Sequence, residues 1–413
     1  MRILFICHYF PPEQPPAAFL SFEFCQALQQ AGHNVDVLTG VPNWPTGRIL
    51  SGYNTHQVIT ENMDGVMVHR LPFLPSPSGG FIRRALDFTS FQLLVKWYGK
   101  KLPRPDLIYV LVPPNEDGIA ARYLANYFNC PYILNVQDLH PDTSINLGFV
   151  KNKLLIYLLK KQARLMYKDS EHVLTIGTEM RNQLVKNGLL PGRVSVLPNW
   201  IDTHAIVPEK KHNALRNDWG IDDNAFVVLY AGTFGRIHGT SILLDVASQL
   251  RESGILLLLV GQGYDFDLLS NEVVNKNHPN VMVKPFVPRS RLSELQALAD
   301  ISIVLAKSGF GLTSVPSKIL GYMAASRPIL AAVDPQSDTA NLIETAHAGM
   351  IVEPENATAI ASALFTLKNQ PLRLKQWGNN ARDYITSHLS SDIVLDDGVR
   401  ILEQIYSDFQ ARH

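Results

Sequence analysis

The chain has 413 residues, which is too long for one ordinary hydrophobic core and predicts two domains. Apolar residues make up 46% of the chain and charged residues 18%, as in a globular protein rather than a disordered one. The formal net charge is zero, which argues against a protein that binds nucleic acid through its bulk charge.

The first half of the chain alternates strand-like and helix-like segments, as parallel α/β sheets do. An apolar run at 2–7 is followed by a helical pattern at 17–30, a helix-ending Gly32 and a second apolar run at 34–40. Further strands are expected at 56–61, 66–71, 106–112, 131–136, 172–176 and 194–197, and helices at 115–128, 151–168 and 178–187.

A second series of the same kind begins after a polar stretch near 203–224. Its strands are expected at 226–232, 255–261, 281–286, 301–306, 328–333 and 349–354, with a helical tail from about 371 to the end. Two such series predict two doubly wound domains. Because ligands of open parallel sheets lie beyond the carboxyl ends of the strands, we expect the two facing edges to define a cleft.

The first loop, "CHYFPPEQPPAA" (7–18), contains no G-x-G-x-x-G, so a dinucleotide-dependent dehydrogenase is a poor candidate. Its prolines make a stiff loop, which serves either as an acceptor contact or as a rigid surface turn.

The loop that opens the second series, "YAGTFGRIHGTS" (230–241), is more informative. Its glycines let backbone N–H groups approach a ligand just before a helix, and Arg236 and His238 lie between them. Alone, this would be a glycine-rich turn with a solvated arginine. The segment "VPSKILGYMAASRPIL" (315–330) supplies a second cation, Lys318, at a helix start without acidic residues. Since a helix N-terminus carries partial positive charge, a lysine there favours a bound anion, and the two loops together predict a diphosphate clamp.

Other candidate motifs are weaker. "VGQGYDFDLL" (260–269) contains a D-x-D at Asp265 and Asp267 that resembles a metal-binding motif, but acidic residues at the first turn of a helix are ordinary caps. We therefore expect no metal and no other cofactor. In "NVQDLHPDTSINLG" (135–148), Asp138, His140 and Asp142 follow a strand, and functional and capping roles are equally open.

Two basic, aromatic stretches favour an anionic membrane surface as a partner. Residues 81–104 carry six basic residues and one acidic residue, and residues 151–168 carry six basic residues and no acidic one. For 151–168, a core helix with a solvated lysine face is a serious alternative. We prefer 81–104, because Phe81, Phe88, Phe91 and Trp97 do not fit one core stripe. No apolar run approaches the ~18 residues of a spanning helix. Three cysteines without a CxxC pair indicate reduced thiols in a cytoplasm.

These residues resemble family 4 of the retaining glycosyltransferases, in particular the bacterial branch that builds surface polysaccharides of the O-antigen and colanic acid type. The resemblance covers nearly the whole chain and is carried by "HYFPPE" (8–13), "AGHNVDVLTGVPNWPTGRI" (31–49), "VQDLHPDTSINLG" (136–148), "VLPNWID" (196–202), "YAGTFGRIHG" (230–239), "VPSKILGYMAASRP" (315–328), "VDPQSDTANLIE" (333–344) and "NNARDY" (379–384). It implies an α/β GT-B fold, with two doubly wound Rossmann-like domains facing a central cleft. Residues 1–202 would bind the acceptor and 203–390 the donor, and a helix at 391–413 would cross back to the first domain.

The resemblance also implies roles for particular residues. Arg236, Lys318 and Asp138 are the expected catalytic residues. The expected donor-binding residues are Gly232, Thr233, Gly235, His238, Gly263, Val287, Ser317 and Asp338. The expected acceptor-side residues are His8, Pro12, Glu13 and His140. The family's phosphate-binding arginine and lysine fall on Thr233 and His238, so Arg236 is the substitute. The second family glutamate falls on Gly321, and Asp338 or Glu344 would take over its contacts.

The function that follows is the metal-independent transfer of a sugar from a UDP-, GDP- or other nucleoside-diphosphate sugar to a lipid-linked or saccharide acceptor. Such an enzyme would lie in the cytoplasm, at the inner face of the membrane. Two alternatives remain: a GT-B-fold sugar-nucleotide epimerase, which needs no acceptor site, and a degenerate transferase that serves as a non-catalytic assembly subunit.

Overall fold

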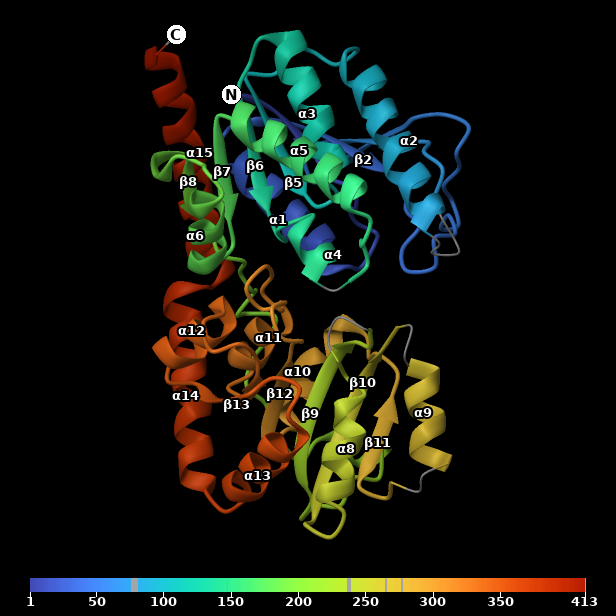
Figure 1. The fold of residues 1–413 in the computed structure, drawn as a ribbon, viewed down its shortest axis with the longest axis vertical. Helices are drawn as coiled ribbons and strands as arrows, with labels where there is room; N and C mark the ends of the chain where they lie inside the picture. Colours follow the sequence, from blue (N-terminus) through green and yellow to red (C-terminus); the bar gives the residue numbers. More distant parts are fainter. Residues whose placement is uncertain (76–80, 147, 236–238, 264–265, 276–277, 413) are drawn as a thin grey trace. The chain divides into compact units, whose positions relative to one another are not determined.

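The computed structural model describes residues 1–75, 81–146, 148–235, 239–263, 266–275 and 278–412. The chain divides into two compact units (Figure 1). The first unit contains Met1–Asn199 together with Val394–His413, and the second contains Trp200–Ile393. These limits lie close to the boundaries expected at residues 202 and 390, and the last residues of the chain belong to the first unit.

The first unit is built on an eight-stranded sheet. Its strands are β1 (Arg2–Ile6), β2 (Asn34–Gly40), β3 (Ile59–Met63), β4 (Val66–Leu71), β5 (Leu107–Val112), β6 (Tyr132–Val136), β7 (His172–Thr175) and β8 (Val194–Val196). Their order is β3-β4-β2-β1-β5-β6-β7-β8. The apolar β5 is buried along its whole length, as expected for a central strand of a parallel sheet.

One antiparallel pair, β3 with β4, closes an edge of this sheet. Asp64 and Gly65 form the two-residue loop between them with φ values of 51° and 90°. Positive φ at both central residues is typical of the tight turns that match the twist of a hairpin. The strand expected at 56–61 is found slightly later, at Ile59–Met63, and ends directly before this turn.

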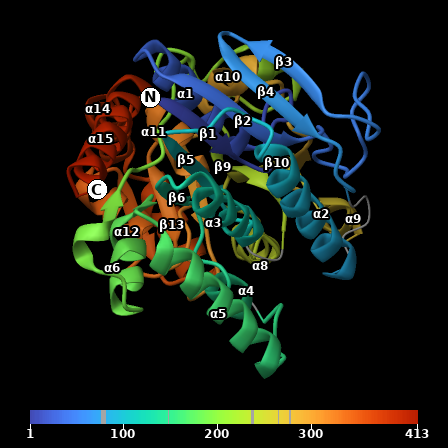
Figure 2. The same cartoon turned by 90° about the horizontal axis from the view of Figure 1, so that it is seen from above.

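Helices of the first unit cover both faces of the sheet (Figure 2). On one side α2 (Phe81–Gly99) packs on α3 (Asn115–Phe128), and α3 packs on α5 (Lys153–Asp169). Elsewhere α15 (Ser391–Arg412) packs on α1 (Pro16–Gln30), where a Cβ at Gly398 would lie 2.8 Å from the Phe24 ring. Shorter helices are α4 (Asp142–Asn146) and α6 (Thr178–Lys186). None of the helices that the structure describes has the length and apolar character needed to cross a membrane.

The second unit contains a six-stranded, fully parallel sheet. Its strands are β9 (Phe226–Thr233), β10 (Ile255–Gln262), β11 (Val281–Lys284), β12 (Ile301–Leu305), β13 (Ile329–Ala332) and β14 (Gly349–Val352), in the order β11-β10-β9-β12-β13-β14. The helices are α7 (Ala214–Asp218), α8 (Ile242–Gln249), α9 (Phe266–Asn275), α10 (Leu292–Ala297), α11 (Lys318–Ala324), α12 (Asp338–Thr345), α13 (Ala357–Lys368) and α14 (Pro371–His388).

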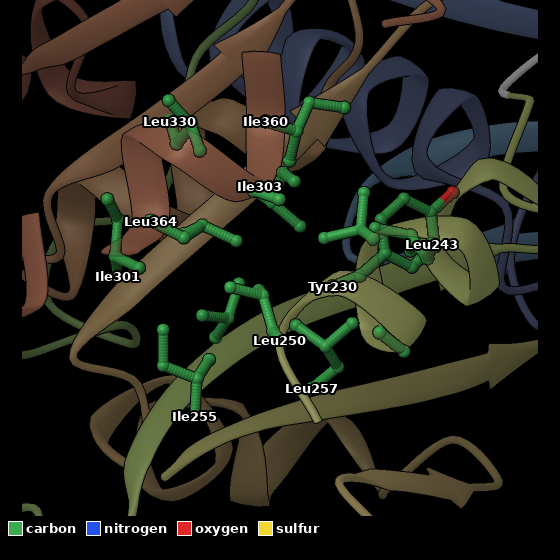
Figure 3. Close-up of a cluster of buried hydrophobic side chains, with 14 of the residues drawn as sticks. Tyr230, Leu243, Leu250, Ile255, Leu257, Ile301, Ile303, Leu330, Ile360 and Leu364 are labelled. Atoms are coloured by element: carbon green, nitrogen blue, oxygen red, sulfur yellow. The ribbon is translucent and has the colours of Figure 1, made fainter. Parts of the chain in front are cut away.

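Figure 3 shows the apolar core on one face of this sheet. Tyr230 and Leu257 of the central strands meet Leu243 of α8 and Leu364 of α13, and all four side chains are buried. Helices α11 and α14 pack on each other elsewhere in the unit. Because all six strands run in the same direction, their carboxyl ends share one edge of the sheet, and the loops at this edge are held by a rigid core.

Candidate functional site

Of the residues expected to bind the donor, those that the structure describes lie at the carboxyl edge of the second sheet. Gly232 and Thr233 end β9, and Gly263 follows β10. Val287 follows β11, Ser317 and Lys318 lie between β12 and β13, and Asp338 follows β13. Gly235 lies just beyond β9. Arg236, His238 and Asp265 lie outside the described residues.

Lys318 is the most unusual side chain at this edge. It is the first residue of α11, its Nζ is buried, and this Nζ has no hydrogen-bond partner among the described residues. The Nζ lies 3.7 Å from the centre of the Tyr230 ring, a cation–π geometry. Burial lowers the pKa of Lys318 to about 7. A buried ammonium without a counterion is costly, so its position favours a site that receives an anion.

A glycine makes room for this lysine. Gly232 has a φ of +154°, which residues with a Cβ rarely adopt, and a Cβ there would lie 2.8 Å from the Lys318 Nζ. The hydroxyl of Tyr322, also on α11, accepts a hydrogen bond from the Ala231 N–H at 2.8 Å. The end of β9 and the start of α11 are thus fixed against each other.

Lys307 is a second cation at this edge, and the sequence analysis did not identify it. It follows β12, and a Cβ at Gly239, in the glycine-rich loop after β9, would lie 3.5 Å from its Cγ. The available signal was a lysine two residues beyond the apolar run "ISIVL", where side chains of parallel strands reach the ligand edge.

The position of the missing family glutamate is tightly packed. A Cβ at Gly321 would lie 3.0 Å from Nε2 of Gln296, which is buried on α10. A larger side chain at this place would have to displace Gln296. Asp338 is largely buried in the first turn of α12, and Ser337 caps that helix by accepting a hydrogen bond from the Ala340 N–H at 3.2 Å.

In the first unit, His8 lies at the carboxyl end of β1 inside an aromatic cluster. Its ring packs edge-on against the rings of Phe73, Phe88 and Phe91. The His8 Nε2 lies 3.3 Å from Oδ1 of Asp87, and both side chains are buried. Asp87, on α2, was not among the expected site residues, because nothing in the sequence connects it with His8.

Pro12 and Glu13 lie in the proline-rich loop, and Glu13 holds this loop in place. Its Oε1 accepts hydrogen bonds from the N–H groups of Asn43 and Trp44, each at 3.0 Å. The carboxylate is buried, and burial raises its pKa although these hydrogen bonds act in the opposite direction. Glu13 therefore links two loops at the carboxyl edge of the first sheet.

Asp138 and His140 lie in the segment between β6 and α4. The His140 Nδ1 lies 3.1 Å from the Ser144 hydroxyl, and its backbone carbonyl accepts a hydrogen bond from the Asn115 amide at 3.2 Å. Burial lowers the pKa of His140. The neutral ring is therefore its resting form at neutral pH, and a neutral imidazole can accept a proton.

Comparisons with known proteins agree with this architecture. The model of the family described as "Glycosyl transferase 4-like domain" matches residues 22–200, and that described as "Glycosyl transferases group 1" matches residues 211–384. The chain is 25% identical over 403 residues to the putative colanic acid biosynthesis glycosyl transferase WcaI of Escherichia coli K12, covering 96% of this chain and 98% of the relative.

Solved structures show the same fold at low sequence identity. Sucrose-phosphate synthase from Thermosynechococcus elongatus has a TM-score of 0.79 and 17% identity, covering 98% of this chain and 99% of that one. Anabaena HepE in complex with UDP and glucose has a TM-score of 0.71 and 16% identity, covering 97% and 99%. With two glycosyltransferase models matching successive segments that together span most of the chain, this protein belongs to the family 4 (group 1) glycosyltransferases and has the GT-B fold.

Proposed function

We propose that this glycosyltransferase transfers a sugar, with retention of configuration, from a nucleoside-diphosphate sugar to a lipid-linked or saccharide acceptor in cell-surface polysaccharide synthesis. The observation that carries the proposal is Lys318 at the carboxyl edge of the second sheet, whose buried Nζ has no partner in the part of the chain that the structure describes. A diphosphate would supply an anion for this ammonium group. The relatives support the choice, since WcaI is named for colanic acid biosynthesis and HepE was solved with UDP and glucose.

In this reaction the protein acts mainly by stabilising charge. The bond between the sugar and the diphosphate breaks, and negative charge develops on the departing phosphate oxygen. Lys318 and Lys307, with the backbone N–H groups of the glycine-rich loop, would stabilise that charge in a preorganised way. In the route that the family favours, the acceptor oxygen bonds to the anomeric carbon of the sugar on the face from which the diphosphate departs. The departing phosphate oxygen takes the proton of that acceptor hydroxyl. This route needs no pair of catalytic carboxylates, unlike glycoside hydrolysis.

The proposal is tested by measuring the melting temperature of the full chain with UDP, GDP, ADP and dTDP, and with their sugars. At least one diphosphate should raise the melting temperature, because a ligand that binds only the folded state stabilises it. The sugar form that binds should then be hydrolysed slowly or transferred to an acceptor. Stabilisation by none of these nucleotides, binding without any turnover, or recovery of an epimerised donor would each contradict the proposal.

We also propose that no metal ion is needed. Asp267 lies in the first turn of α9, where a carboxylate stabilises the helix, and Lys318 can supply the positive charge that a metal ion supplies elsewhere. Turnover should therefore survive incubation with excess EDTA, measured against the same enzyme with added magnesium or manganese. Activity lost in EDTA and restored by either metal would show this expectation to be wrong.

Donor binding should depend on pH through Lys318. Its pKa is lowered to about 7 in the free protein, and an adjacent diphosphate favours the charged amine and raises that pKa. Binding at pH 8 should therefore take up a proton, and the affinity should fall as the pH rises above 7. Titration calorimetry in two pH 8 buffers with different ionisation enthalpies measures this uptake. Equal uptake by a Lys318→Met variant would assign the proton to another group.

We further place the enzyme in the cytoplasm, at the inner face of an anionic membrane. Three cysteines support the first part, since Cys7 and Cys25 are buried free thiols and Cys130 is a free thiol as well. A lipid-linked acceptor would make the membrane the place of the reaction.

A further inference from the structure

Helix α5 exposes an apolar stripe. Leu154, Tyr157, Leu158 and Leu165 are 67%, 61%, 51% and 43% exposed, respectively. They lie three, four and seven residues apart, so they share one face of the helix. The opposite face packs into the unit through Ala163, Met166 and Tyr167, which are buried. The stripe is therefore not a part of the core.

A row of cations runs along one side of this stripe. Lys153, Lys160, Arg164 and Lys168 follow one another at intervals of seven, four and four residues, and no acidic residue occurs between 151 and 168. Lys160 forms an ion pair with Asp142 at 3.1 Å. Lys153, Arg164 and Lys168 form no ion pair with any residue that the structure describes.

The same row borders a cavity of about 460 Å³ between α5 and α6. Lys160, Arg164 and Lys168 line it on the α5 side, and Leu189 and Leu190, which follow α6, line it as well. Its other apolar lining comes from Leu139, Ala163, Tyr167, Val173 and Leu184. The cavity has the size of small-molecule sites. Besides the three cations of α5, its lining includes Arg193, His140 and Asp142, the partner of Lys160.

Helix α2, the membrane element preferred from the sequence, is less suited to this role. Phe91 is fully buried against His8, so this aromatic residue belongs to the core and is not available to a membrane. Lys100 donates a hydrogen bond to the Tyr123 hydroxyl at 2.8 Å, and Arg104 binds the carbonyl of Phe128 at 2.9 Å. Lys101 lies 3.4 Å from the centre of the Trp97 ring. These cations are already engaged with their own unit.

We propose that α5 and the cavity beside it form a binding site for the anionic phospholipids of a membrane. The apolar stripe enters the interface, one acyl chain occupies the cavity, and the lipid phosphate pairs with Lys160, Arg164 and Lys168. Charge complementarity selects this occupant, because a row of cations beside an apolar cavity matches a lipid that is anionic at one end and apolar at the other. The inference rests on the proposed function in one respect: an enzyme with a lipid-linked acceptor works at a membrane.

Sedimentation of the full chain with vesicles tests the proposal. Wild type should bind phosphatidylglycerol vesicles and bind phosphatidylcholine vesicles weakly at physiological salt. The variant K160Q/R164Q/K168Q should bind phosphatidylglycerol vesicles on the order of 10²-fold more weakly, since each cation near an anionic surface contributes about a fivefold factor. The matched control R83Q/K100Q/K101Q, with three cations removed from the α2 segment, should bind like wild type. Loss of binding in the control alone, or equal binding by all three proteins, would overturn the proposal.

The cavity is tested with soluble probes. Dihexanoylphosphatidic acid should bind wild type more tightly than inorganic phosphate does, and Leu190→Glu, at a 65% exposed position, should remove that difference. Equal affinity for the two probes would eliminate the acyl-chain site. Unchanged circular dichroism and melting temperature show that each variant is folded. If K160Q/R164Q/K168Q no longer binds vesicles but is still stabilised by a nucleoside diphosphate, the lipid site is supported and is separate from donor binding. If wild type binds vesicles but no nucleotide, the proposed function fails while the lipid site stands.

Discussion

Replacing Lys318 with methionine should lower the turnover of the nucleotide-sugar by about 10²–10³-fold, the usual loss for one group that stabilises developing negative charge. Lys318 is the cation with a buried Nζ at the start of α11, and methionine keeps an unbranched side chain as far as Cε and removes the charged Nζ. Turnover is measured as transfer or as slow donor hydrolysis, under saturating donor. Near wild-type turnover would remove Lys318 from the diphosphate site.

The same substitution should leave the protein at least as stable as the wild type. The pKa of Lys318 is lowered in the folded state, so between about pH 7 and the ordinary pKa of lysine the unfolded chain binds a proton that the folded chain does not. The lysine therefore costs stability near neutral pH, and this cost declines as the pH rises through that window. Methionine carries no such cost. Melting temperatures at pH 7 and pH 9.5 should show a larger gain for the variant at pH 7.

A matched control separates this effect from a general loss of positive charge. Lys375 is an exposed lysine on α14 in the same unit. Lys375→Met should leave both turnover and melting temperature close to those of the wild type. A residue that lowers stability and yet is needed for turnover is the pattern expected of a functional site. Equal losses of turnover in both variants would indicate a bulk electrostatic effect instead.

Much of the fold was predictable because apolar runs and turn residues are local signals. The runs at 106–112 and 255–261 became β5 and β10 with nearly the expected limits, since a strand buried on both faces is apolar along its whole length. A helix start at Lys318 was also predictable, and α11 begins there.

What the sequence could not provide depends on contacts between distant residues. The contact of His8 with Asp87 joins β1 to α2, and the position of Lys307 beside Gly239 joins two different loops. The surroundings of the aromatic residues in α2 depend on such contacts as well. Phe91 and Trp97 look alike in the sequence, yet Phe91 is buried and Trp97 is 54% exposed. Only the packing of α2 on its neighbours distinguishes them.

Gly232→Ala should lower turnover nearly as far as the loss of Lys318 itself. A Cβ at this position would lie 2.8 Å from the Lys318 Nζ and 2.9 Å from its Cε, closer than such atoms approach. The backbone φ of +154° adds strain, on the order of 1–3 kcal/mol for a residue with a Cβ. The lysine end is the part that can move, so we expect it to leave the Tyr230 ring and its place beside β9. The protein should fold with a modest loss of stability.

A double-mutant cycle decides whether the glycine acts through the lysine. If the alanine works by displacing Lys318, adding Gly232→Ala to Lys318→Met should lower turnover only slightly further, because the interaction it disturbs is already absent. If instead the two losses multiply, Gly232 contributes independently, for example by letting its own N–H approach the diphosphate. Methionine in place of Lys318 also removes the crowded Nζ, so the double variant should recover part of the stability lost by Gly232→Ala alone. Turnover and melting temperature of the four proteins therefore report the same contact in two ways. Coupling between the two substitutions in one measurement but not in the other would contradict the contact of Lys318 with Gly232.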